Sequence, residues 1–134
     1  MRIAYLTTDE VNEGRALEWA RRHVITLCPL APKDGPPDGS FDAVLCDWDY
    51  WPAREATLDE LLAGPATRPV ALHSYNVGPE QAKALRRRGV AVHRHLRAAV
   101  LGSLCQAVLA ARVAAACGLR RGDVPPAEGV DGAA

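Results

Sequence analysis

Short apolar runs alternate with amphipathic segments along the first 117 residues of the chain. Five runs have the length and composition of buried strands, and they cover residues 2–7, 24–27, 41–46, 69–74 and 90–93. A parallel strand that is covered on both faces reads as a nearly continuous apolar run, and residues 41–46, interrupted only by Asp42, fit this description. The pattern therefore predicts five strands.

Helical periodicity fills most of the intervals between these strands. Helices are predicted over residues 12–23, 57–64, 80–88 and 96–117. Thr57 and Glu60 have the spacing of a capping box, so we expect Thr57 to cap the second helix. Residues 29–40 are rich in Pro, Gly and Asp, which predicts a surface loop in which a helix is short or missing.

This alternation determines the expected fold class. Parallel strands need crossover connections, and these connections are right-handed. We predict an α/β fold with a single doubly wound, five-stranded parallel sheet of the flavodoxin-like type, in three αβα layers. Residues 1–117 are expected to form one domain, and residues 118–134, which are polar and rich in Pro and Gly, to be a disordered tail.

Composition narrows the function classes. The chain has 16 basic and 16 acidic residues, so its net charge gives no reason to expect a nucleic-acid partner. Its four cysteines lack the spacing of zinc or redox sites and are expected to be reduced. No secretory signal is visible over residues 1–6, which favours the cytoplasm. Residues 98–119 carry one charge, Arg112, yet they are rich in Ala, so we do not favour a membrane helix.

Polar residues follow several of the predicted strands. In a doubly wound sheet, ligands gather at the carboxyl ends of the strands. The residues expected there are Thr7, Thr8, Asp9, Asp47, Trp48, Asp49, Ser74, Arg94 and His95. Carboxylates, a hydroxyl and a cation around one crevice can hold a hard cation and accept a phosphoryl group on a carboxylate, although each residue could equally serve its loop.

Two of these strand ends resemble a known family. Residues 41–47 resemble the third strand, and residues 69–74 the fourth strand, of the receiver domains of two-component response regulators, within an overall resemblance that covers residues 1–117. The resemblance implies that Asp47 is the phosphoacceptor and Ser74 the switch hydroxyl. It also implies Asp9 and Asp47 as ligands of Mg²⁺, and Arg94 as the cation that contacts the phosphoryl group.

The chain departs from the receiver pattern at three places. Receivers carry an acidic pair at the end of the first strand, where this chain has Thr7 and Thr8. A receiver has Lys followed by Pro after its fifth strand, where this chain has Arg94, and the Pro four residues after the acceptor is here Pro52, five after Asp47. A carboxylate without a complete magnesium site is a poor phosphoacceptor. We therefore expect a degenerate receiver, neither an enzyme nor a cofactor protein, with Mg²⁺ only if Asp47 is phosphorylated.

The leading hypothesis is a signal-transduction module that acts by protein contact. Its expected partner is another protein or a second copy of the chain, bound through the helix over 80–88, the strand over 90–93 and the last helix. The cations of that face are Arg86, Arg87, Arg88, Arg94 and Arg97. A ridge of small side chains at Ala107, Ala111 and Ala115 is expected to permit close approach of another helix.

Two alternatives remain open from the sequence. One is a receiver that is phosphorylated on Asp47. The other is a small-molecule-binding protein or an enzyme of flavodoxin-like fold, with a crevice under the aromatic cluster of Trp48, Tyr50 and Trp51. A glycine-rich phosphate loop would favour this alternative, but no glycine follows the first strand before Gly14.

Overall fold

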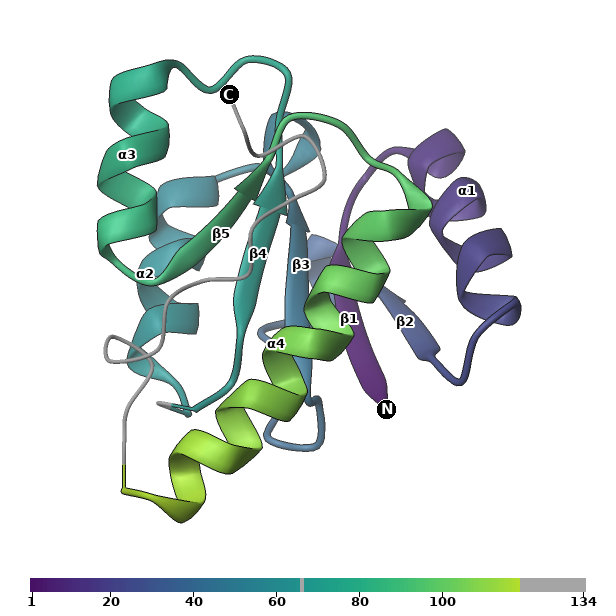
Figure 1. Ribbon diagram of the computed structural model, residues 1–134. Coiled ribbons are helices and arrows are strands. Elements are labelled where there is room, and N and C mark those ends of the chain that lie inside the picture. The colour runs from purple at the N-terminus through teal and green to yellow at the C-terminus, as the bar shows by residue number, and fades with distance from the viewer. Residues whose placement is uncertain (66, 119–134) are drawn as a thin grey trace.

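The computed structural model describes residues 1–65 and 67–118, which form a sheet with helices on both faces (Figure 1). Its strands are β1 (Arg2–Leu6), β2 (Thr26–Leu30), β3 (Ala43–Asp47), β4 (Val70–His73) and β5 (Val90–His93). Its α-helices are α1 (Glu10–Arg21), α2 (Arg54–Ala63), α3 (Pro79–Arg87) and α4 (Ala98–Ala116). Two short 3-10 helices are η1 (Pro32–Asp34) and η2 (Trp48–Tyr50).

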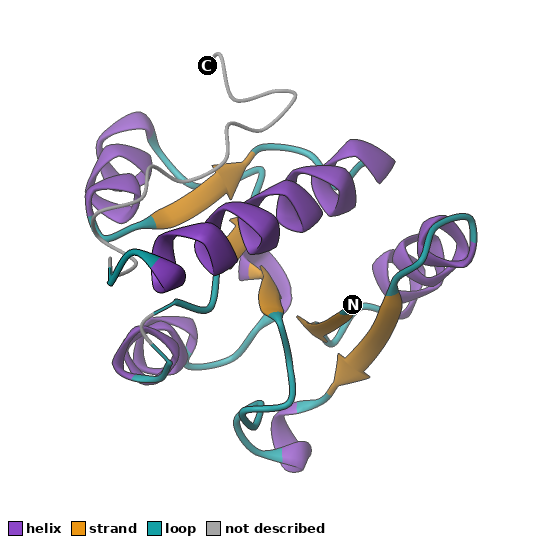
Figure 2. Ribbon diagram, turned by 60° about the horizontal axis from the view of Figure 1, so that its bottom comes forward, coloured by secondary structure: helices purple, strands orange, loops and turns teal. Residues whose placement is uncertain are grey.

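All five strands are parallel, in the order β2-β1-β3-β4-β5. This is the order of a flavodoxin-like sheet, so the predicted fold class is confirmed. Helices α1 and α4 cover one face and helices α2 and α3 cover the other, in three layers (Figures 1 and 2). The tail predicted for residues 118–134 lies, apart from Gly118, outside the described residues.

Alternation along the strands gives the sheet two hydrophobic cores. Ile3, Leu45 and Ala71 point toward α1 and α4, where they pack with residues such as Leu101 and Leu104 of α4. The neighbouring positions Ala4, Val44 and Leu72 point toward α2 and α3. Alternate residues of a strand therefore contact different pairs of helices. The same alternation decides on which face the polar residue at each strand end lies.

The connection between β2 and β3 contains no α-helix, as expected from its Pro, Gly and Asp content. Within residues 31–42 the only helical turn is η1. The predicted bounds of β2, residues 24–27, were wrong. The strand begins two residues later, at Thr26, and continues through Pro29 to Leu30, and Val24 is 93% exposed. Pro29 is tolerated because β2 is an edge strand, paired only with β1.

Helix α2 begins earlier than its predicted cap. Thr57 is not the N-cap: the helix starts at Arg54, after Ala53, which has left-handed backbone angles (φ 48°, ψ 39°). The Thr57 hydroxyl instead accepts a hydrogen bond of 3.0 Å from the indole of Trp51. Arg54 donates to the backbone carbonyl of Trp48 at 3.0 Å, which ties the first turn of α2 to η2. These tertiary contacts override the local capping signal.

Helix α4 is, within the described residues, the one helix whose length and apolar composition would allow it to cross a membrane. Its inner positions, including Val100, Leu104 and Val108, are buried against the sheet. Of the expected ridge of small residues, Ala107 and Ala111 are half-buried and Ala115 is exposed, and contact of this ridge with another helix stays a prediction. The large apolar side chains exposed on this helix are Leu109 and Val113.

Candidate functional site

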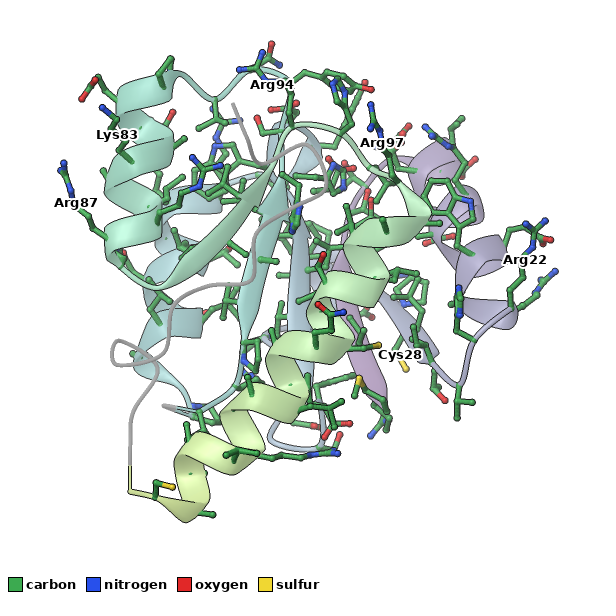
Figure 3. All side chains as sticks on the ribbon, viewed as in Figure 1. Arg22, Cys28, Lys83, Arg87, Arg94 and Arg97 are labelled. Carbon is green, nitrogen blue, oxygen red and sulfur yellow. The ribbon has the colours of Figure 1, made fainter. Side chains whose placement is uncertain are left out.

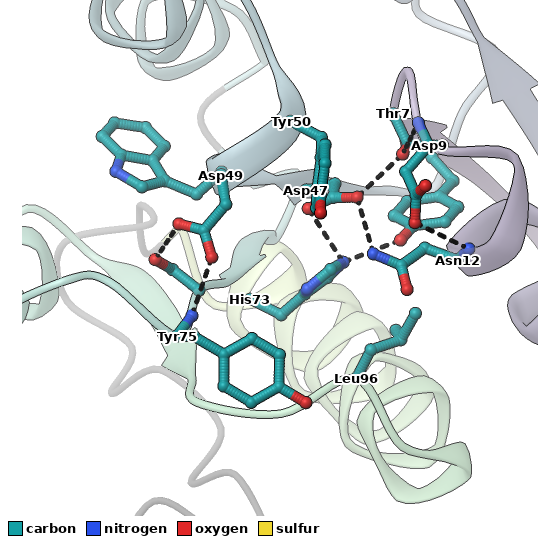
Figure 4. Close-up of polar contacts among 12 residues, drawn as sticks. Thr7, Asp9, Asn12, Asp47, Asp49, Tyr50, His73, Tyr75 and Leu96 are labelled. Carbon is teal, nitrogen blue, oxygen red and sulfur yellow. Dashed lines mark hydrogen bonds and ion pairs between the residues drawn. The ribbon is translucent and has the colours of Figure 1, made fainter.

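Five polar side chains meet at the carboxyl edge of the sheet, on the face covered by α1 and α4 (Figure 4). We call them the Asp47 cluster: Tyr5, Thr7, Asn12, Asp47 and His73. β1 supplies Tyr5 and is followed by Thr7, α1 supplies Asn12, and β3 and β4 end on Asp47 and His73. Asp47 and His73 are partners in the register of β3 and β4, which brings them together.

Asp47 is enclosed by neutral hydrogen-bond donors. Its side chain is 1% exposed, and its Oδ2 accepts from the Thr7 hydroxyl at 2.8 Å and from the Asn12 side-chain amide at 3.0 Å. No lysine or arginine of the described chain forms an ion pair with it. Thr7 and Asn12 therefore satisfy the hydrogen-bonding capacity of Asp47 Oδ2 in this buried position.

His73 and Tyr5 complete the cluster on the other side of Asp47. The imidazole Nε2 lies 2.7 Å from the Tyr5 hydroxyl and 3.8 Å from Asp47 Oδ1. Burial lowers the pKa of His73 below its usual value, and this effect outweighs the opposing attraction of Asp47. Burial, together with the nearby charge of Asp47, raises the pKa of Tyr5 far above its usual value. Both rings are therefore neutral near pH 7, and they share one hydrogen bond.

Asp9 does not join the cluster; it caps α1. Its Oδ2 accepts a hydrogen bond from the backbone N–H of Asn12 at 3.1 Å, and its own backbone N–H donates to the Thr7 hydroxyl at 3.0 Å. No group of three or more His, Cys, Asp or Glu side chains within the described residues is arranged to hold a metal ion. The pairing of Asp9 with Asp47 as metal ligands stays a prediction.

Ser74 is turned toward Asp49 rather than toward Asp47. Its hydroxyl donates to Asp49 Oδ1 at 2.5 Å and accepts from the backbone N–H groups of Asn76 and Val77. The second oxygen of Asp49 accepts from the backbone N–H of Tyr75 at 2.9 Å. Successive residues of a strand point to opposite faces, so Ser74 follows His73 onto the other side of the sheet. Asp49 and Ser74 together hold the loop after β4.

The remaining candidate residues lie apart from the Asp47 cluster. Arg94 is exposed beyond β5 and makes no ion pair with the described residues. Trp48 and Trp51 are buried in the core under α2 and α3, whereas Tyr50 is exposed. The guanidinium of Arg54 lies 5.2 Å from the centre of the Trp48 ring. The two tryptophans are thus part of the core, not the cover of an open crevice.

This geometry limits what Asp47 can do chemically. A carboxylate oxygen that attacks a phosphoryl group must be reachable, and the group that it attacks needs a cation to neutralise its charge. Asp47 Oδ2 already has two donors, and the side chain is almost fully covered. In this arrangement Asp47 serves as a buried hydrogen-bond acceptor for Thr7 and Asn12.

Sequence reasoning missed Tyr5, Asn12 and His73 as members of this site. The signal for Tyr5 was its position two residues before Thr7, because residues at that spacing point to the same face of a strand. The signal for Asn12 was its place three residues after the capping Asp9, in the first turn of α1. Neither signal indicates that the partner is Asp47.

No model of a protein family and no curated protein sequence matches the chain.

Proposed function

We propose that this protein is a degenerate receiver-like signalling module that acts by protein contact and does not depend on phosphorylation of Asp47. The observation that carries the proposal is the enclosure of Asp47 by Thr7, Asn12 and His73. Phosphorylation of a receiver needs an exposed acceptor carboxylate beside a metal ion. Here the side chains of Thr7, Asn12 and His73 surround the carboxylate instead. Cytoplasmic location remains part of the proposal.

The contact surface in this proposal is formed by α3, β5 and α4. Leu109 and Val113 are exposed on α4, and cations are exposed along α3 and after β5. Arg is enriched where proteins contact proteins, and the exposed apolar side chains of α4 would be covered by another protein or a second copy of the chain. Ser74 supports this view indirectly, because a hydroxyl held by Asp49 is unavailable as a switch.

The two alternatives have less support. Phosphorylation of Asp47 would require the Thr7 and Asn12 hydrogen bonds to break before a phosphodonor could reach Oδ2. A crevice for a small molecule under Trp48 and Trp51 has no support from their positions in the core. We therefore keep the protein-contact function as the proposal.

Intact-mass spectrometry after incubation with Mg²⁺ and acetyl phosphate tests the proposal. We expect no phosphoryl group on the wild-type chain, because Asp47 is covered and lacks an acidic neighbour. Thr7→Asp is the informative variant, since it places a second carboxylate where a hydroxyl now lies 2.8 Å from Asp47. Two adjacent carboxylates repel each other and attract a hard cation, so Mg²⁺ should stabilise the variant and leave the wild type unchanged.

A phosphoryl group on the wild-type chain that Asp47→Ala abolishes would overturn the proposal. The same measurement on Ser74→Ala serves as a control, because loss of that hydroxyl leaves the Asp47 cluster intact.

A further inference from the structure

A cavity of about 160 Å³ lies between α3 and β5, on the opposite face of the sheet from the Asp47 cluster. It is lined by Val77, Gly78, Pro79, Ala82, Lys83, Arg86, Val92 and Arg94. Three of these residues are cations and none is acidic. Its floor is apolar, because Val92 and Ala82 belong to the core under α2 and α3.

The basic rim is part of a strong local excess of positive charge. Residues 79–97 contain six Lys and Arg side chains and one acidic residue, Glu80, although the whole chain is neutral. Figure 3 shows Lys83 and Arg94 toward the same end of the molecule, and Arg87 further along α3, pointing outward. Charge of one sign around a concave surface with apolar walls attracts ligands of the opposite sign.

The three cations differ in how they are held. Arg86 is fixed across the cavity, because its Nη2 donates to the carbonyl of Val92 at 3.1 Å. Arg94 has no hydrogen bond or ion pair with the described residues. Lys83 is 3.9 Å from Glu80, and both are mostly exposed, so this pair is weak. Arg94 and Lys83 are therefore available to an incoming anion.

The first turn of α3 adds to this field. Gly78 precedes the helix and contributes no side-chain cap, so the first backbone N–H groups of α3 lack a partner from that residue. The positive end of the helix dipole thus lies at the cavity, where Gly78 and Pro79 form part of the wall. This contribution supplements the three side chains.

We propose that this cavity binds a small organic anion. Its phosphate or carboxylate group contacts Arg94 and Lys83, and a short apolar part lies against Val77, Ala82 and Val92. The volume matches a small ligand or the acidic end of a larger one, since pockets for drug-sized molecules are about 300–1,000 Å³. The cavity lies within the proposed contact surface, but the inference does not rest on the proposed function, because anion binding requires neither a protein partner nor any residue of the Asp47 cluster.

Nuclear magnetic resonance titration of the full-length ¹⁵N-labelled chain tests this site. The probes are phenyl phosphate, inorganic phosphate and benzyl alcohol, which separate the anionic group from the apolar part. We expect saturable shifts of the Gly78, Ala82 and Val92 amides with phenyl phosphate, weaker binding of inorganic phosphate, and no binding of benzyl alcohol. Binding of inorganic phosphate as tight as that of phenyl phosphate would refute the contribution of the apolar floor.

Two variants that each remove one charge decide whether the cavity is the site. Arg94→Gln should weaken phenyl phosphate binding about tenfold, as expected for one lost charge-assisted hydrogen bond. Arg87→Gln removes the same charge from α3 at a position that does not line the cavity, so its binding should be close to that of wild type. Equal losses in the two variants, or no saturable shift at the three amides in wild type, would overturn the proposal.

Discussion

Replacement of Asp47 by alanine should destabilise this protein by about 2 kcal/mol, because it leaves a buried hydroxyl without its acceptor. Thr7 is buried and donates to Asp47 at 2.8 Å, so its hydroxyl would lose its acceptor. Asn12 is half-buried and can turn toward solvent, and His73 keeps the Tyr5 hydroxyl, so these two add little. If Asp47 instead lay among other carboxylates, as in a magnesium site, Asp47→Ala would relieve charge repulsion and stabilise the protein.

Urea denaturation followed by circular dichroism measures this effect. With an m-value of about 2 kcal/mol/M, the loss moves the midpoint by about 1 M. Asp47→Asn is the matched control, because the amide retains one oxygen that can accept from Thr7, and it should fall between wild type and Asp47→Ala.

A double-mutant cycle with Thr7→Val identifies the cause. In the wild-type background Thr7→Val should destabilise, because Asp47 loses a donor. In the Asp47→Ala background it should be nearly neutral or stabilising, because it removes the unsatisfied hydroxyl, which gives a coupling energy of about 1–2 kcal/mol. Additive effects, or an Asp47→Ala variant as stable as wild type, would refute the account of Asp47 as the acceptor that holds this cluster together.

Three further predictions concern acid, the last helix and the thiols. Burial lowers the pKa of His73 from 6.5, so the unfolded chain binds more protons than the folded protein at acid pH. The free energy of unfolding should therefore fall as the pH drops below about 6.5. Urea midpoints measured against pH should show a smaller fall for His73→Gln than for wild type. Val113→Glu should change the free energy of unfolding by less than about 0.5 kcal/mol, whereas Ala114→Glu should unfold the chain, since Val113 is 68% and Ala114 7% exposed. Sedimentation of Val113→Glu beside wild type also shows whether this face joins two copies. A thiol reagent should label the exposed Cys117 in the folded protein and Cys46 only after unfolding, because burial raises the pKa of the Cys46 thiol to about 12; rapid labelling of Cys46 would contradict its buried position.

The fold class could be read from the sequence because it rests on the alternation of apolar runs with helical segments. Five apolar runs with crossover segments allow few topologies, and residues 41–46 have the composition of a central strand. The sequence also placed Asp47 and Ser74 at the same edge of the sheet, and they lie at the end of β3 and directly after β4. Helix boundaries were less accurate, because Trp51 engages Thr57 through a tertiary hydrogen bond that no local pattern encodes.

The partners within the site could not be read in the same way. Which residue faces Asp47 depends on the register of β3 against β4, and a shift of one residue would exchange His73 for Ser74. The sequence does not specify that register. The choice between a metal-binding carboxylate and a helix cap at Asp9 likewise depends on where α1 begins, which is uncertain by a few residues in any sequence-based assignment.

The connection without a helix between β2 and β3 has a consequence for how this fold can evolve. β2 is an edge strand with one neighbour, so the absence of a helix over it uncovers only that strand. Even so, Cys28 and Leu30 are partly buried against the core. Loss of α2 or α3 would instead uncover β3, β4 or β5 and the buried side chains of an entire core. Deletions and insertions in a three-layer fold should therefore accumulate over its outermost strand first. In this chain the exposed residues 33–36 are a segment where an inserted peptide tag should be tolerated.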